Sequence, residues 1–151
     1  MKRLTLIICM YLLTSSLNAQ NGNDYHIVEQ FVYHQLVIIN AQTKQTIESF
    51  DDYKGAVASA IVGEQEYLII TMTKDIGFNL MIVNKAEEIF DDNWKIRMYQ
   101  GGGKIDGLGS YTANVFFNYD LQYNTKIPET IRFEMDGSPY IYELSGIIKI
   151  E

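Results

Sequence analysis

The run YTANVFFNY, residues 111–119, decides the fold of this chain because its side chains alternate in character. One face of the run carries Tyr111, Ala113, Val115, Phe117 and Tyr119. The other face carries Thr112, Asn114, Phe116 and Asn118. A period of two is typical of a half-buried β-strand. The run WKIRMY, residues 94–99, alternates in the same way and places Lys95 and Arg97 opposite Trp94, Ile96 and Met98.

Two segments upstream are apolar on both faces, residues 67–72 and 78–83. Strands of this type lie in the middle of a sheet or between two layers. The short segment 74–77 between them ends in Gly77, which favours a hairpin turn. Residues 66–119 therefore predict four strands in succession.

In the N-terminal third, helix and strand signals compete. Residues 36–39 and 46–50 predict strands, and residues 25–35 fit either a short helix or a strand. Asp51 and Asp52 precede the alanine-rich segment 53–62, and Gly63 follows it. Because Asp caps helices, Ala favours them and Gly ends them, this segment predicts a helix.

The remaining segments complete a β-rich domain. Residues 84–93 predict an acidic connection, and alternation predicts strands over 131–135 and 140–144, with a turn at 136–139. We expect an all-β fold, mainly an antiparallel meander in a barrel or a two-layer sandwich, with one or two short helices. The alternative is an α+β fold with a helix packed on an antiparallel sheet.

Residues 1–19 resemble a cleaved signal peptide in their pattern. Lys2 and Arg3 precede the apolar run 4–13, and Ala19 provides a small residue before the expected cut at Gln20. Ile8 precedes Cys9 inside the apolar run, so we do not expect a lipoprotein. We expect an exported protein, periplasmic or secreted, with one β-rich domain over residues 20–151 and no membrane span in the mature chain.

Composition narrows the class of partner. The full chain carries a net charge of −7, and removal of Lys2 and Arg3 with the leader changes it to −9. Nucleic acids and anionic membranes reward clustered Lys and Arg, so we expect neither nucleic acid nor such a membrane surface as a partner. Cys9 is the only Cys, so the mature chain forms no disulfide.

The glycine-rich segment 101–110 is the most distinctive candidate site. Six of its ten residues are Gly or Ser, which predicts a mobile hairpin tip or a lid. Met98 and Ile105 break the pattern of a phosphate loop around Lys104. Tyr combines apolar area with a polar tip and suits binding faces. We therefore predict binding residues in and beside this segment, namely Tyr99, Lys104, Asp106 and Tyr111.

Other site chemistries find little support in the sequence. The acidic segment 84–93 lacks the glycine and the ligand spacing of a calcium loop, and His26 and His34 have no Cys to join them in a zinc site. We expect no metal and no cofactor. Leu108 and Thr112 occupy the positions around Ser110 where a hydrolase elbow needs glycine.

Three functions follow from these observations. The first is an exported non-enzymatic binding or interaction domain whose partner the sequence does not identify. The second is a small β-barrel that binds an apolar small molecule among its inward side chains. The third is a hydrolase with an acid pair, such as Asp106 with Asp120.

Overall fold

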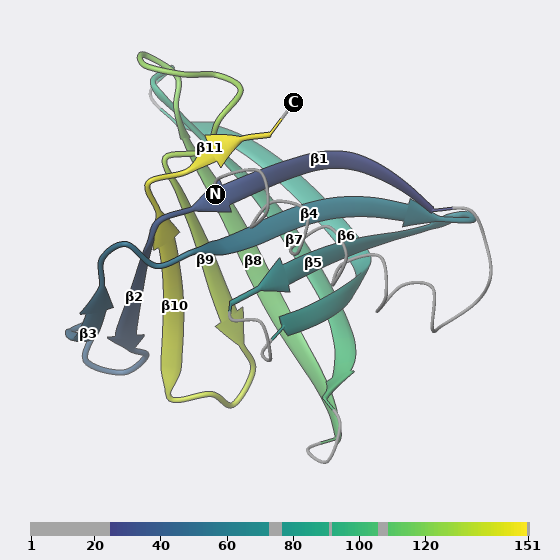
Figure 1. Ribbon diagram of the computed structural model, residues 1–151, viewed down its shortest axis with the longest axis horizontal. Helices are drawn as coiled ribbons and strands as arrows, with labels where there is room; N and C mark the ends of the chain where they lie inside the picture. Colours follow the sequence, from purple (N-terminus) through teal and green to yellow (C-terminus); the bar gives the residue numbers. More distant parts are fainter. Residues whose placement is uncertain (1–24, 73–76, 91, 106–108, 151) are drawn as a thin grey trace.

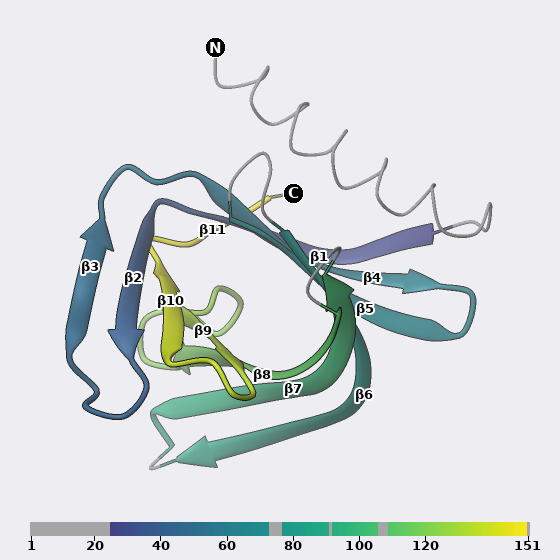
Figure 2. The same cartoon turned by 90° about the horizontal axis from the view of Figure 1, so that it is seen from below.

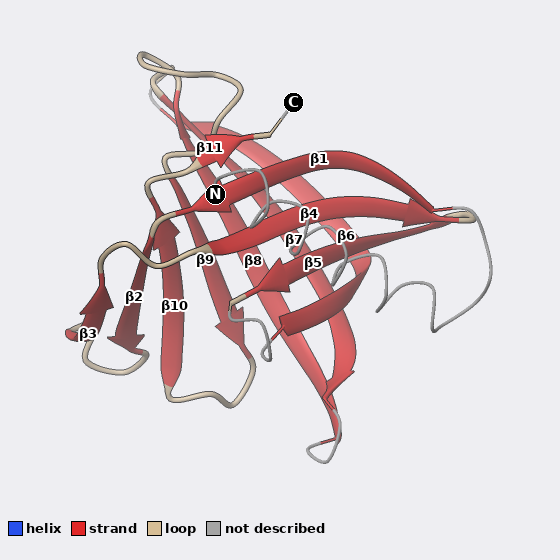
Figure 3. Ribbon diagram, in the orientation of Figure 1, coloured by secondary structure: helices blue, strands red, loops and turns tan. Residues whose placement is uncertain are grey.

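The chain is all-β in the computed structural model, which describes residues 25–72, 77–90, 92–105 and 109–150 (Figure 1). Within these residues there is no helix (Figure 3). The strands are β1 (Tyr25–Tyr33), β2 (Gln35–Asn40), β3 (Thr46–Phe50), β4 (Gly55–Val62), β5 (Gln65–Thr71), β6 (Gly77–Phe90), β7 (Trp94–Ile105), β8 (Gly109–Asp120), β9 (Thr130–Met135), β10 (Tyr140–Ser145) and β11 (Ile148–Lys149).

All strands belong to one antiparallel sheet, in the order β11-β1-β4-β5-β6-β7-β8-β9-β10-β2-β3. From β4 to β10 each strand pairs with the next one along the chain. The prediction of an antiparallel meander is therefore confirmed. The sheet formed by the described strands is not closed, because its edge strands β11 and β3 do not pair with each other.

Bent strands curl this sheet around a core. Only His34 separates β1 from β2, yet β1 pairs with β4 and β11, whereas β2 pairs with β10 and β3. The continuous segment 25–40 thus belongs to both ends of the sheet. It bends at His34, whose amide donates a hydrogen bond to the Ser145 carbonyl at 3.2 Å. Figure 2 shows the resulting arc, with β6, β7 and β8 on one side and β2 and β3 on another.

Side chains fill the inside of the arc. Phe117 on β8 packs against Phe31 and Tyr99, with ring centroids 6.0 and 5.2 Å apart. Phe78 and Phe133 form a second contact at 4.9 Å. The predicted apolar face of β8 is confirmed from position 113 onward, since Ala113, Val115, Phe117 and Tyr119 are all buried.

The helix predicted over residues 53–62 is wrong, because most of this segment forms β4. Six successive residues, 55–60, are buried between β1 and β5. Small alanines fit such a crowded central strand, so packing overrides their helix preference. The undecided segment 25–35 forms β1, the His34 bend and the start of β2, and the α+β alternative is therefore wrong as well.

Two predicted connections are largely strand. The acidic segment 84–93 continues β6 as far as Phe90, after a bulge between Ile82 and Asn84. The predicted glycine loop is wrong for residues 101–105 and 109–110, which belong to β7 and β8. A Cβ on Gly101 would collide with the backbone carbonyl of Met81, so glycine permits two strands to approach closely. The leader, residues 74–76 of the predicted turn 74–77, and residues 106–108 lie outside the described residues, and Gly77 begins β6.

Candidate binding site

The sheet divides between β5 and β6. The two strands pair only where Tyr67–Thr71 run beside Gly77–Met81. Beyond the bulge, β7 is the one strand that pairs with residues 84–90 among the described residues, and all seven residues are exposed. We call residues 84–90 the β6 edge. Figure 2 shows this part of β6 as the outer strand of the β6–β7 pair, on the side away from β8.

A side chain ends the ladder where the two strands part. Gln65 Nε2 donates to the Ile82 carbonyl at 2.8 Å and to the Glu66 carbonyl at 3.1 Å. A buried carbonyl without a partner costs free energy, so this amide replaces a backbone donor that β5 no longer supplies. The separation is therefore a capped end of the β5–β6 ladder.

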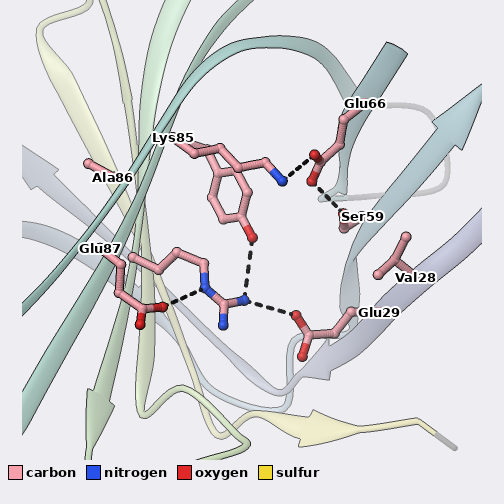
Figure 4. A pocket seen from close by; sticks show the side chains of 9 residues that line it. Val28, Glu29, Ser59, Glu66, Lys85, Ala86 and Glu87 are labelled. Carbon is pink, nitrogen blue, oxygen red and sulfur yellow. Dashed lines mark hydrogen bonds and ion pairs between the residues drawn. The ribbon is translucent and has the colours of Figure 1, made fainter. Parts of the chain in front are cut away.

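A hollow of about 390 Å³ lies beside this division, between the β1–β4–β5 arm and the β6–β7 pair (Figure 4). We call it the side opening. The β1–β4–β5 arm contributes Val28, Glu29, Ser59 and Glu66, whereas β6 and β7 contribute Lys85, Ala86, Glu87, Arg97 and Tyr99.

Arg97 is the centre of the side opening. Its Nε donates to Glu87 at 3.2 Å and its Nη1 donates to Glu29 at 3.4 Å, so it connects β7 with both β6 and β1. Nη1 also lies 3.4 Å from the Tyr99 hydroxyl, and the guanidinium lies 5.5 Å from the centre of the Tyr119 ring. Burial by itself lowers the pKa of Arg97. The hydrogen bonds and nearby charges raise this pKa by more than burial lowers it, so the guanidinium remains cationic.

Every carboxylate of the side opening has a cationic partner. Glu66 pairs with Lys85 and accepts a hydrogen bond from Ser59 Oγ at 3.1 Å. Besides Arg97, Glu87 lies 3.8 Å from Lys95 Nζ, and Glu29 lies 3.7 Å from Lys149 Nζ. A ligand with a single charge would leave one of these groups unpaired, at a cost in free energy. The opening therefore suits a ligand that carries both donors and acceptors.

The two basic residues of the 94–99 run lie over tyrosine. Lys95 Nζ is 4.5 Å from the centre of the Tyr119 ring, on the same face as Arg97. The ring is buried, its hydroxyl has no hydrogen-bond partner among the described residues, and burial raises its pKa. Lys95 and Arg97 lie on the opposite face of β7 from Trp94, as predicted, and it is this basic face that points toward the Tyr119 ring.

The predicted site residues do not form one cluster. Tyr99 lines the side opening, whereas Lys104 is exposed and pairs with Ser110 near the far end of β7, about 17 Å along the strand from Tyr99. The Tyr111 hydroxyl donates to the Asn79 carbonyl at 3.1 Å, and burial raises the pKa of Tyr111 to about 12. Asp106 lies outside the described residues. A binding role for the set remains a prediction.

The charged residues of the side opening were not predicted as a site. Glu29 on β1 is far in the sequence from Glu66, Lys85 and Arg97, which lie on the successive strands β5, β6 and β7. The only local signal is the Lys-x-Arg alternation of residues 95–97 beside the acidic segment 84–93. Pairing of β6 with β7 brings Glu87 opposite Arg97, and only that register reveals the network.

Asp120, the second member of the proposed acid pair, has a structural role. Its Oδ1 accepts a hydrogen bond from the Gln122 amide at 3.0 Å, and its carbonyl accepts from Asn124 at 2.9 Å. These bonds shape the start of the β8–β9 loop. A second hollow, of about 360 Å³, lies under this loop and is lined in part by Asp120, Tyr123 and Ile147.

Two further properties concern the described residues only. None of their His, Cys, Asp and Glu side chains gather in threes as a metal ion would require. They include no helix with the length and apolarity needed to cross a membrane.

Comparison with known proteins identifies no relative. No protein-family model, curated protein or solved structure matches this chain significantly. Inference about function therefore depends on the geometry of the β6 edge and the side opening.

Proposed function

We propose that this protein is an exported, non-enzymatic binding domain that holds an extended polypeptide segment along the β6 edge. The observation that carries the proposal is an exposed seven-residue strand edge beside a charged hollow in which every carboxylate is already paired. Export follows from the signal pattern of residues 1–19.

Backbone groups provide the affinity in this proposal. A strand that pairs on only one side leaves every second amide and carbonyl free on the other side. An extended peptide adds to such an edge as a further strand, and its main chain makes the hydrogen bonds. The capped β5–β6 ladder keeps this edge apart from β5, because Gln65 already occupies the Ile82 carbonyl.

Side chains provide the specificity. Lys85, Ala86 and Glu87 belong both to the β6 edge and to the lining of the side opening, so a bound strand lies next to Glu66 and Arg97. Charges on an edge discourage strands that do not complement them. The preferred ligand is therefore an extended segment with opposite charges at alternate positions.

The other two functions have less support. A small apolar ligand needs space inside the sheet, whereas the rings of Phe31, Tyr99 and Phe117 pack against one another there. A hydrolase needs two cooperating acids, whereas Asp120 caps a turn. Edge binding uses backbone groups of residues 84–90 that have no strand partner within the part of the chain that the structure describes.

Selection from a phage-displayed library of random 12-residue peptides tests the proposal. We expect enriched peptides that lack proline at their centre and carry alternating charge. Ala86→Pro and Glu87→Pro, made separately, provide the control, because adjacent amides of a strand point in opposite directions. One of the two variants therefore removes an amide that faces the open edge, and we expect it to fold normally and lose the peptides.

Circular dichroism verifies the fold of each variant. Lys104→Ala is a matched control on β7, and we expect it to bind the selected peptides as the wild type does. The proposal fails if no peptide is enriched, or if both folded proline variants bind the enriched peptides with wild-type affinity.

A further inference from the structure

We infer that the strand that occupies the β6 edge is the β6 edge of a second copy, paired antiparallel about a two-fold axis at Ala86. This inference rests on the proposed function of the edge and specifies its partner. Closed two-fold dimers are the commonest protein oligomers, and their interfaces bring one surface against itself. The edge must therefore complement its own sequence, NKAEEIF, over residues 84–90.

Symmetry permits few registers. A two-fold axis perpendicular to the sheet keeps the inner faces of both copies on one side, so residues opposite each other differ by an even number of positions. Axes at Lys85, Glu87 or Glu88 would place identical charges directly opposite each other. Such pairs are destabilising. Among residues 85–88, only Ala86 places a small neutral residue on the axis.

The Ala86 register produces opposite charges on both sides of the axis. Lys85 of each copy lies opposite Glu87 of the other copy, and Asn84 lies opposite Glu88. Cross-strand pairs of opposite charge stabilise a sheet. Within each copy Lys85 already pairs with Glu66 and Glu87 with Arg97, so the new pairs join two existing networks into one.

Apolar residues lie at one end of the edge and immediately before the other end. Val83 is 68% exposed and Ile89 is 58% exposed. In the Ala86 register Ile89 of one copy lies nearest Val83 of the other, the bulged residue that precedes the edge. Pairing thus removes exposed apolar surface from water and excludes water from the charged centre. Along one face of the strand, Lys85 and Glu87 lie between the apolar residues Val83 and Ile89, and this order is complementary to itself about Ala86.

Sedimentation velocity over a range of concentrations tests the inference. We expect a dimer that dissociates on dilution, since an edge of this length buries a small area. Lys85→Glu and Glu87→Lys should each raise the dissociation constant about tenfold, because each creates two like-charge pairs across the interface. The double variant should recover wild-type affinity within about threefold, because it inverts both pairs.

Recovery in the double variant separates dimerisation from stability. Within one copy the double variant places a carboxylate at position 85 beside Glu66 and an ammonium group at position 87 beside Arg97, so it restores neither internal ion pair. Circular dichroism and thermal unfolding measure how much stability each copy loses with these two internal ion pairs. Failure of the folded double variant to dimerise would overturn the inference.

A cysteine on the axis provides a second test. Ala86→Cys, made in the full chain with Cys9→Ser, places a cysteine of each copy on the axis. Their Cα atoms lie about 4.5–5.5 Å apart, which is within disulfide range. We expect a covalent dimer under mild oxidation. The matched control Glu88→Cys lies opposite Asn84 and should cross-link at least tenfold more slowly. Equal cross-linking, or a monomer at every concentration, overturns self-pairing. If library peptides still bind the monomer at the β6 edge, the proposed function survives.

Discussion

Gly101 shows how one residue can decide whether a segment is a loop or a strand. A Cβ at this position would meet the Met81 carbonyl, whose backbone position is fixed by the sheet. We expect Gly101→Ala to lower the free energy of unfolding by about 1–3 kcal/mol, the usual effect of overpacking. Urea unfolding measures it. Gly77→Ala is the control, because its nearest contact is the Ile70 carbonyl at 3.3 Å. Equal losses in both variants would contradict the close approach of β6 and β7.

Two buried tyrosines differ in what their hydroxyl groups contribute. The Tyr33 hydroxyl donates to the Thr71 carbonyl at 3.1 Å, whereas the Tyr119 hydroxyl has no hydrogen-bond partner within the described residues. Tyr33→Phe should therefore cost about 1 kcal/mol of stability, and Tyr119→Phe should be neutral or stabilising. Thermal unfolding of the two variants compares them directly. A larger loss from Tyr119→Phe would show that its hydroxyl is bonded.

At the scale of elements, sequence predicts strands whose pattern is local. The alternation of residues 111–119 and 94–99 predicted β8 and the first half of β7 correctly; one face of β8 is buried from position 113, whereas residues 95–98 of β7 are half-buried on both faces. The alternation does not say which face turns inward, and Lys95 and Arg97 lie inside over Tyr119. Side chains distant in the sequence decide that choice.

The errors occurred where packing overrides local preference. The alanines of β4 favour a helix in isolation, but β1 and β5 enclose them on both sides. Residues 84–90, which include Lys85, Glu87 and Glu88, form a strand because β7 pairs with them. Of the predicted site, Tyr99 lies in the side opening, yet Glu29 and Glu66 join it only through the register of the sheet.

Hydrogen exchange of the β6 edge reports on this element directly. In a dilute monomer, every second amide of residues 84–90 should exchange fast, because it faces no strand, while its neighbours are bonded to β7. Raising the protein concentration should protect the fast set alone. Uniform slow exchange in a proven monomer would mean that the edge is covered from within the chain.

For the whole molecule, the buried tyrosines predict how stability depends on pH. Burial raises the pKa of Tyr111 to about 12, against about 10 in the unfolded chain. The Tyr111 hydroxyl is neutral in the folded and the unfolded state below pH 10, so the stability linked to its raised pKa is fully present there. Above pH 10 the unfolded state loses its proton first, and stability falls as the pH approaches 12. Urea unfolding at pH 9, 10 and 11 should show this decline, and Tyr111→Phe should reduce it. A flat profile would contradict the burial of the hydroxyl.

Export concerns the whole molecule as well. The charged start, apolar run and Ala19 predict a mature chain that begins at Gln20. Mass spectrometry of protein from the native host measures the cleavage site. Recovery of a chain that retains residues 1–19 would show that the segment is not a cleaved signal.

The most direct measurement of edge binding is the amide spectrum of the ¹⁵N-labelled protein during titration with a peptide enriched from the random library. We predict that the largest shifts fall on the β6 edge, residues 84–90, with smaller shifts at Glu66, Arg97 and Tyr99 around the side opening. Shifts concentrated near Lys104 and Tyr111, at the opposite end of β7, with the β6 edge unchanged, would contradict binding at this edge.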